Sequence, residues 1–357
     1  MNSLFSNIKV IELAGVLAGP SVGVFFSELG AKVIKVENKK TQGDVTRTWK
    51  LSSEEKGNVP GAYYWSVNTG KEILFLDITQ TKDLEQLYAL TKEADILITN
   101  YKKGDDVKLK VDYTTLSKMN PKLIYGSING FGNDSSRTAY DLILQAESGF
   151  MHMNGEKHSQ PLKMPVALID VLAGHQLKEA ILIALLKREL TKKGSHISVS
   201  LLDSALAALV NQATNWLIAK QLPQASGSLH PNIAPYGEIF NTSDDQLITF
   251  AIGNDKQFVQ LCEFMGLTQL ASDTKFKTNQ DRVANRRELF ELFKTKLEAL
   301  TFDSIYKYCL QHDIPIGKIR NLKEVFELPE AQHMLKPFTD NGQHKNAVRS
   351  VAFKFLD

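Results

Sequence analysis

The chain has 357 residues, of which 43% are hydrophobic and 23% are charged. This composition excludes a disordered or fibrous protein, and the length favours two domains. The formal net charge of +2 excludes the strongly basic surface that nucleic-acid binding or binding to an anionic membrane requires.

The compartment is indicated by what the sequence lacks. Two cysteines, Cys262 and Cys309, are too few for a zinc site or a disulfide framework, which favours a reducing environment. No secretory signal is evident, and the most apolar helical stretch, 180–186, is far shorter than the roughly 20 residues that span a bilayer. We expect a cytoplasmic protein with no membrane partner.

Short apolar runs alternate with helical patterns over about the first 130 residues. Such alternation predicts a mostly parallel sheet with helices on both faces. The predicted strands are 8–13, 32–37, 73–78, 94–99 and 122–128, and the predicted helices are 20–29, 83–92 and 113–119.

The second half of the chain is richer in helical patterns. A proline-rich segment, 222–235, is the best domain boundary. The predicted elements before it are a long helix over 171–190, a strand over 196–200 and a helix over 201–220; those after it are a hairpin of 236–241 with 247–252 and helices within 255–310.

Familiar catalytic motifs are missing from the sequence. There is no G-x-G-x-x-G, P-loop, H-E-x-x-H or G-x-S-x-G pattern, which disfavours dehydrogenases, kinases, zinc hydrolases and α/β-hydrolases. The eight histidines form no i, i+4 pair, so we expect no metal site.

Asp170 is the sharpest candidate for chemistry. It closes the apolar run 165–169, which we interpret as a strand, and stands just before the long helix. One reading makes it the N-cap of that helix. The other places it where open α/β sheets hold their sites, with the helix dipole keeping its carboxylate ionised and available as a nucleophile towards a carbonyl.

Basic residues gather in loops that we expect to follow the strands. These loops share one edge of a parallel sheet, and the residues form either a solvated rim or a polyphosphate site. Beside them, Asn100 and Tyr101 offer an amide and a flat ring to a heterocycle, and Asp141 has the position of an N-cap. The basic residues are Lys39, Lys40, Arg47, Lys71, Lys102, Lys103 and Lys108.

The sequence resembles the class III CoA-transferases, the formyl-CoA transferase and carnitine CoA-transferase type. The resemblance runs in order over roughly residues 8 to 290. It is carried by the fragments LAGVLAGPS at 13–21, ELGAKVIKVE at 28–37, GD-x-x-R at 43–47, ADILITNY at 94–101, YDLILQ at 140–145, DVLAG at 170–174 and APYG at 234–237.

The resemblance implies a fold and an assembly. It implies a Rossmann-like large domain (1–221), a smaller α+β domain (222–325) and a C-terminal return to the large domain (326–357). It also implies a homodimer of two interlocked rings.

The resemblance also implies a mechanism in which CoA is a substrate and no metal takes part. Asp170 matches the aspartate that attacks an acyl-CoA and then carries CoA as an aspartyl thioester, before an acceptor carboxylic acid takes it. By the same match Val16 and Ala18 line the CoA path, Asn100 and Tyr101 flank it, Lys71 and Lys108 meet phosphates, and Tyr140 lies near the reacting centre.

The chain departs from the family pattern at several positions. Asn38 stands where an arginine is common, and Gly70 and Glu72 stand where the family has Asn and Arg; Lys39 and Lys40 are the candidates to compensate. Leu17 replaces a polar residue, which disfavours oxalate as the acceptor. The glycine-rich loop of some members is reduced to Ser-Gly-Ser at 226–228.

Two alternative functions stay open. One is an α-methylacyl-CoA racemase of the same superfamily, disfavoured because Tyr140 stands where racemases have the histidine that is their second base. The other is a degenerate relative that binds CoA without turnover, favoured by Asn38 and Glu72 and opposed by the presence of Asp170.

Overall fold

The structure is a computed structural model that describes residues 4–56 and 59–356. The described chain divides into two compact units. The first contains the chain up to Asn154, the segment Pro161–Pro223 and the residues from His333 onwards. The second contains Gly155–Gln160 and Gln224–Gln332.

A parallel six-stranded sheet forms the centre of the first unit, in the order β3-β2-β1-β4-β5-β6. It confirms the α/β prediction, and the five predicted strands of the first half are all present. The strands are β1 (Lys9–Glu12), β2 (Lys32–Asn38), β3 (Glu72–Leu76), β4 (Ile96–Thr99), β5 (Ile124–Asn129) and β6 (Ser195–Ser200).

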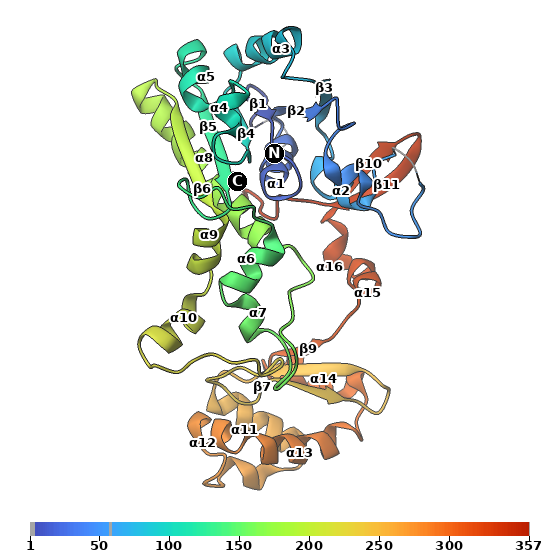
Figure 1. Cartoon of the computed structure of the whole chain (residues 1–357). Coiled ribbons are helices and arrows are strands. Elements are labelled where there is room, and N and C mark those ends of the chain that lie inside the picture. Colours follow the sequence, from blue (N-terminus) through green and yellow to red (C-terminus); the bar gives the residue numbers. More distant parts are fainter. Residues whose placement is uncertain (1–3, 57–58, 357) are drawn as a thin grey trace. The chain divides into compact units, whose positions relative to one another are not determined.

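Helices cover both faces of this sheet (Figure 1). The helices α1 (Ala18–Glu28) and α8 (Leu168–Thr191) pack on one face, and α3 (Thr81–Lys92) and α5 (Tyr113–Met119) pack on the other. The remaining elements of this unit are η1 (Val45–Thr48), α2 (Ala62–Asn68), α4 (Asp105–Lys108), α6 (Asp141–Glu147), α7 (Phe150–Met153), α9 (Leu201–Ala207), α10 (Val210–Leu217) and the antiparallel hairpin of β10 (Leu335–Asp340) with β11 (Gln343–Val348).

The alternation of side chains along the strands explains the two layers. Successive residues of a strand point to opposite faces. In β1, Val10 belongs to the core under α1 and α8, whereas Ile11 belongs to the core under α3 and α5. A central parallel strand is therefore apolar at consecutive positions, as the sequence is.

The second unit is built on a small antiparallel sheet in the order β7-β8-β9. It confirms the predicted hairpin, and Cys262 and Cys309 are both buried, unpaired, in its apolar core. Its elements are β7 (Tyr236–Asn241), β8 (Leu247–Ala251), α11 (Asp255–Phe264), η2 (Thr268–Ala271), α12 (Asn279–Ala284), α13 (Arg286–Leu297), α14 (Phe302–Gln311), β9 (Ile316–Lys318), α15 (Leu322–Glu327) and α16 (Pro329–Gln332).

Two predicted elements are wrong. The run 165–169 is not a strand: Val166 is exposed, no strand of the described residues pairs with this run, and α8 already begins at Leu168. The predicted helix 201–220 is broken into α9 and α10, because Val210 has a φ of 32°, which a continuous α-helix does not allow.

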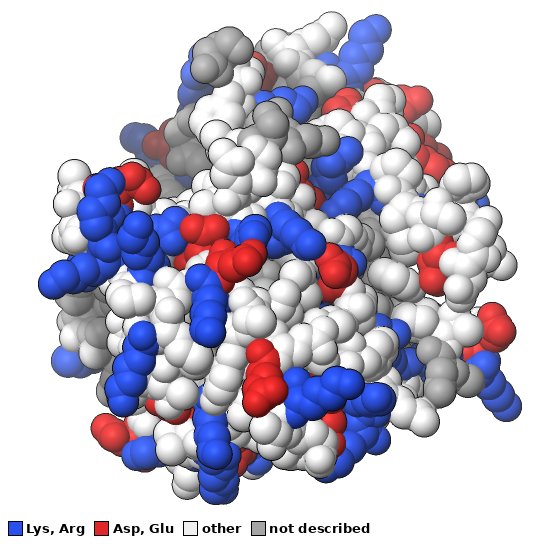
Figure 2. Space-filling view, turned by 90° about the horizontal axis from the view of Figure 1, so that it is seen from above, with Lys and Arg blue, Asp and Glu red and all other residues white. Residues whose placement is uncertain are grey.

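The surface and the helices carry few features of a membrane or nucleic-acid partner. Among the described residues, no helix combines the length and the apolar character needed to cross a bilayer. On the face shown in Figure 2, Lys and Arg side chains are interspersed with Asp and Glu side chains. That mixture fits the small net charge of the sequence.

Candidate functional site

The strand order places a site at the point of the sheet where the order of successive strands reverses. From β1 the chain runs to β2 on one side, while β4 pairs with β1 on the other. In open α/β sheets, ligands bind beyond the carboxyl ends of the strands at this switch point. Here the turn after β1 carries Gly15, Val16 and Leu17, and the loop after β4 carries Asn100 and Tyr101.

A pocket of about 140 Å³ lies at this switch point. Six of the eight site residues expected from the sequence line it, although they come from four separate segments of the chain. These six are Val16, Ala18, Asn100, Tyr101, Tyr140 and Asp170.

Asp170 lies inside the first turn of α8 and is 7% exposed. It is not the N-cap, which is Ala167, so that reading is wrong. No described residue donates a hydrogen bond to its carboxylate, although the carboxylate lines the pocket. A buried carboxylate without donors is costly for a fold, so its presence calls for a functional explanation.

The side chain that caps the N-terminus of α8 is that of Asp141 and not, as expected, that of Asp170. Its Oδ1 accepts the backbone N–H groups of Ile169 and Asp170 at 2.7 and 3.3 Å. Its Oδ2 accepts a hydrogen bond from the Gln145 side chain at 2.6 Å. Asp141 was expected to cap its own helix, but Tyr140 is the N-cap of α6, and the Asp141 carboxylate caps α8 instead.

The surroundings of Asp170 shift the pKa of its carboxyl group. Burial, together with the nearby negative charge of Asp141, raises the pKa of Asp170 to about 7 from its ordinary 3.8. Burial and the charge of Asp141 therefore oppose the ionisation of Asp170 that was expected from the helix dipole. At neutral pH, Asp170 is held between its two protonation states, as many active-site groups are.

Two further basic residues, Lys102 and Arg137, line the pocket. Lys102 was expected only as one of the basic loop residues, and its ammonium donates to the Thr138 hydroxyl at 2.9 Å. Arg137, which the sequence analysis did not name, pairs with Glu147. Nothing in the local sequence of Arg137 marks it, since it enters the site through a loop after β5.

Tyr63, on α2, was also missed. Burial and the charges of Asp170, Asp141 and Asp44 raise the pKa of Tyr63 to about 12, so its phenol stays protonated. Only the fold reveals this relationship, because the sequence around Tyr63 is a run of aromatic residues with no distinguishing feature.

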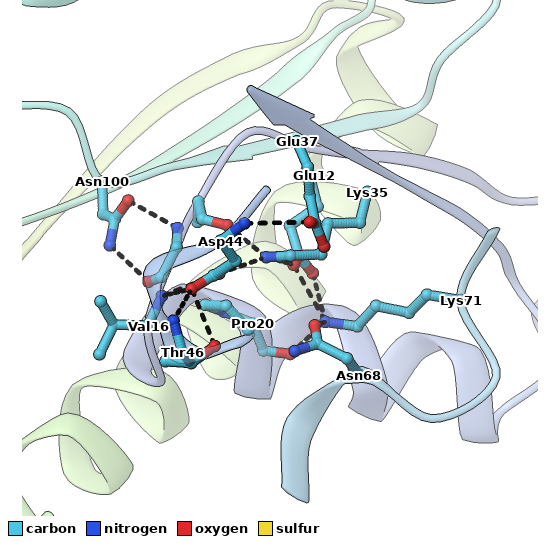
Figure 3. Close-up of polar contacts among 12 residues, drawn as sticks. Glu12, Val16, Pro20, Lys35, Glu37, Asp44, Thr46, Asn68, Lys71 and Asn100 are labelled. Carbon is cyan, nitrogen blue, oxygen red and sulfur yellow. Dashed lines mark hydrogen bonds and ion pairs between the residues drawn. The ribbon is translucent and has the colours of Figure 1, made fainter. Parts of the chain in front are cut away.

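Lys71 lies elsewhere than the sequence suggested. It precedes β3 rather than following a strand, and its side chain is completely buried. Its ammonium contacts Glu12 at 2.7 Å and the carbonyl of Pro20 at 2.9 Å (Figure 3). Burial, opposed by the charge of Glu12, lowers the pKa of Lys71 to about 8. Lys71 lines neither this pocket nor the one beside it.

A second pocket, of about 210 Å³, adjoins the first along the same sheet edge. The two share Gly15 and Tyr101 as lining residues. Asn38 lines the second pocket, whereas Glu72 pairs with Lys32 on the surface. Lys108 lines neither pocket; its side chain is 78% exposed and contacts Asp105 at 3.2 Å.

The polar groups of the site do not form a metal centre. Over residues 4–56 and 59–356, no group of three or more His, Cys, Asp or Glu side chains is placed to hold a metal ion.

Comparison with known proteins gives the family. The family model described as CoA-transferase family III matches residues 5–355. The chain is 39% identical to the succinate–glutarate CoA-transferase of Agrobacterium fabrum over 92% of this chain and 82% of the relative. It is 34% identical to the human succinyl-CoA:glutarate CoA-transferase, covering 93% of this chain and 76% of the relative.

Further relatives and a solved structure agree. The acetyl-CoA:oxalate CoA-transferase of Acetobacter aceti is 33% identical over 93% of this chain and 85% of the relative. A crystal structure of a CaiB/BaiF family protein from Brucella suis superposes with a TM-score of 0.83 at 36% identity, covering 98% of this chain and 92% of the other. The chain is an enzyme, and it belongs to CoA-transferase family III.

Proposed function

We propose that this enzyme moves CoA from an acyl-CoA donor to a carboxylic acid through a covalent intermediate on Asp170. The observation that carries the proposal is the Asp170 carboxylate, which faces the pocket at the switch point with no hydrogen-bond donor among the described residues. A carboxylate that is largely buried and not paired with a cation is a stronger nucleophile than one in water.

The proposed sequence conserves every atom. A carboxylate oxygen of Asp170 attacks the thioester carbon of the donor, the C–S bond breaks, and a mixed anhydride and the CoA thiolate form. The thiolate attacks the Asp170 carbonyl, which releases the donor acid and leaves an aspartyl thioester. The acceptor carboxylate then displaces the thiolate to form a second anhydride. The thiolate finally attacks the acceptor carbonyl and frees Asp170.

CoA is a substrate in this scheme, and we place it along the two adjoining pockets. The thioester would lie beside Asp170, with Val16 and Ala18 along it. The pantetheine arm would pass Asn100 and then Gly15 and Tyr101, the two residues that both pockets share. The adenosine end would occupy the second pocket, near Asn38.

Two basic candidates for the phosphates have different surroundings. The Lys40 ammonium lies 3.2 Å from Asp77, which lines the second pocket, so this carboxylate already neutralises part of its charge. Lys108 is exposed and would have to turn towards the ligand. Lys71 is buried against Glu12, which argues against the phosphate contact expected for it.

A dicarboxylic acid is the proposed acceptor. The relatives include enzymes named for succinate, glutarate and mesaconate. Lys102 lines the Asp170 pocket, and its ammonium has a hydroxyl rather than a carboxylate as its partner. It is therefore suited to neutralise the second carboxylate of such an acid.

Racemisation is less well supported than transfer. A two-base racemase needs a second proton carrier opposite the aspartate. No histidine is among the residues that line the described pocket, and Asp141 is engaged by two backbone N–H groups.

A homodimer is part of the proposal. Large apolar side chains are exposed along α8, along α10 and at the C-cap of α10. They support association of two chains, as the family resemblance implies. They are Ile183, Leu186, Leu190, Trp216, Leu217 and Ile218.

Oxygen exchange tests the mechanism directly. An acceptor acid labelled with ¹⁸O at both carboxylate oxygens should leave one heavy oxygen on Asp170 in each turnover, detected by mass spectrometry of the peptide that contains it. Asp203→Asn serves as the matched control, because Asp203 holds the corresponding position in the first turn of α9 but is exposed. This variant should label Asp170 normally, whereas Asp170→Asn should show no turnover.

Each outcome has a clear meaning. Turnover without label on Asp170 would exclude the covalent route. Exchange of the α-hydrogen of the acyl group with deuterated water, without label on Asp170, would point to a racemase. CoA binding with neither reaction would point to a relative that binds CoA without turnover.

A further inference from the structure

The turn that forms one wall of the Asp170 pocket is strained. Val16 has a φ of 69°, in the left-handed region that β-branched residues rarely adopt. Such a conformation costs on the order of 1–2 kcal/mol and persists only where the surroundings enforce it. Since Val16 lines the pocket, its backbone conformation determines the shape of the wall that faces Asp170.

Two side chains from outside the turn enforce this conformation (Figure 3). The Asn100 amide donates to the Gly15 carbonyl at 2.8 Å, and its oxygen accepts the Gly15 N–H at 3.0 Å. The Val16 N–H donates to Oδ2 of Asp44 at 3.1 Å. The turn is thus held on one side by an amide and on the other by a carboxylate.

Asp44 is itself fixed in place. Its side chain is 2% exposed, and its Oδ2 lies 3.0 Å from the Lys35 ammonium. Its Oδ1 accepts hydrogen bonds from the backbone N–H and the hydroxyl of Thr46, at 3.0 and 2.9 Å. Burial opposes ionisation, but the charge of Lys35 and the hydrogen bonds from Thr46 hold the pKa of Asp44 below its usual value.

A line of buried charges continues behind Asp44. Lys35 contacts Oε1 of Glu12 at 3.0 Å, and Glu12 contacts Lys71 at 2.7 Å. The charges alternate in sign from Lys71 through Glu12 and Lys35 to Asp44, so this line holds two positive and two negative side chains. Buried ion pairs of this kind contribute little net stability compared with apolar residues, so fixing a geometry is the better account of them.

We infer that Asp44 is a positioning residue of this enzyme: it holds Val16 in the left-handed conformation that shapes the wall facing Asp170. Glu12, Lys35 and Lys71 hold Asp44 in turn. The inference rests on the proposed function of the pocket. It gives Lys71 a role that needs no contact with CoA.

A double-mutant cycle with glycine at position 16 tests the inference, because glycine adopts a positive φ without cost. Asp44→Asn should weaken CoA binding about tenfold, measured by calorimetry, and should raise the KM for acyl-CoA more than it lowers kcat. Val16→Gly alone removes a side chain that lines the pocket, so its own effect on both quantities is the baseline of the cycle. In the Val16→Gly background, Asp44→Asn should change CoA affinity by less than about threefold, because the glycine turn no longer needs the carboxylate.

Asp112→Asn is the matched control, since Asp112 also caps a helix through a threonine N–H and hydroxyl but lies away from both pockets. It should leave CoA affinity unchanged. Normal CoA affinity in Asp44→Asn, or an additive loss in the double variant, would overturn the inference.

The remaining outcomes are also decisive. If Asp44→Asn does not fold but the double variant folds and binds CoA, the inference is supported. If neither folds, Asp44 serves the fold and the inference fails. Because CoA binding is measured without turnover, a loss of binding in Asp44→Asn that is absent in the Val16→Gly background, with no oxygen label on Asp170, would retain the inference while rejecting the proposed chemistry.

Discussion

The carboxylate of Asp141 caps the helix that carries Asp170, accepting the Asp170 N–H at 3.3 Å. One acidic residue thus orients the other and, through its charge, raises the pKa of its neighbour. Pairs of carboxylates in different surroundings are a common way to assign different roles to chemically equal groups.

The pH dependence of turnover should report this pair. Since only the ionised Asp170 is a nucleophile, kcat/KM of the unmodified enzyme should rise with pH, with a midpoint near the Asp170 pKa of about 7. Asp141→Asn removes a negative charge that opposes ionisation, so the midpoint should fall by roughly one pH unit. A full pH profile of both enzymes measures the change.

The control for this profile is Asp203→Asn, which changes the charge of the protein equally but lies in α9. Its midpoint should match that of the unmodified enzyme. An unmoved or raised midpoint in Asp141→Asn would contradict the assigned coupling.

The stability difference between Asp170→Asn and the unmodified protein should depend on pH. The pKa of Asp170 is higher in the folded protein, about 7, than the ordinary 3.8 that we take for the unfolded chain. The folded state therefore binds more protons between these values, and stability is lost as the pH rises through this window. The asparagine variant does not titrate and avoids a cost of up to about 4 kcal/mol at pH 8.

Urea unfolding at pH 4 and pH 8 measures this difference. The free energy of unfolding of the variant should exceed that of the unmodified protein at pH 8 and should be close to it at pH 4. An equal difference at both pH values would show that Asp170 titrates alike in the folded and unfolded chains.

Replacing Lys71 should cost stability. Lys71→Met leaves Glu12, which is fully buried, with Lys35 as its remaining cationic partner. Removing one partner of a buried ion pair typically lowers the free energy of unfolding by about 3–5 kcal/mol. Denaturant unfolding should show this loss, compared with Lys32→Met, in which the broken pair with Glu72 is exposed and worth at most about 1 kcal/mol.

The same variants separate two roles of Lys71. Equal stability of Lys71→Met and Lys32→Met, together with a steep loss of CoA affinity in the former, would favour a phosphate contact over the structural role.

The sequence predicted the sheet and the location of the site because both depend on local patterns. The alternation of apolar runs and helical segments identified the strands, and the loops after parallel strands necessarily share one edge. Asn100 was placed in such a loop for this reason, whereas Val16 was placed at the site by the resemblance to the family. Gly30, which directly follows the predicted helix 20–29, adopts a positive φ of 97°, as a glycine at a helix end often does.

The remainder depended on contacts between distant segments. Asp141 and the start of α8 are separated by 28 residues along the chain, so local rules assigned Asp141 to its own helix. Lys71 was read as a basic loop residue because its partner, Glu12, precedes it by 59 residues. Lys35 has the appearance of a solvent-facing strand residue, and only the fold shows that it is enclosed by two carboxylates.

The first unit is completed by residues that leave the ribosome after the whole of the second. The buried Glu28, at the end of α1, accepts the backbone N–H groups of Ser350 and Val351 at 2.9 and 3.0 Å. In a nascent chain, the Glu28 carboxylate therefore lacks these two hydrogen-bond donors until Ser350 and Val351 have been synthesised. Ribosome-bound intermediates that stop short of Ser350 are expected to recruit chaperones at α1.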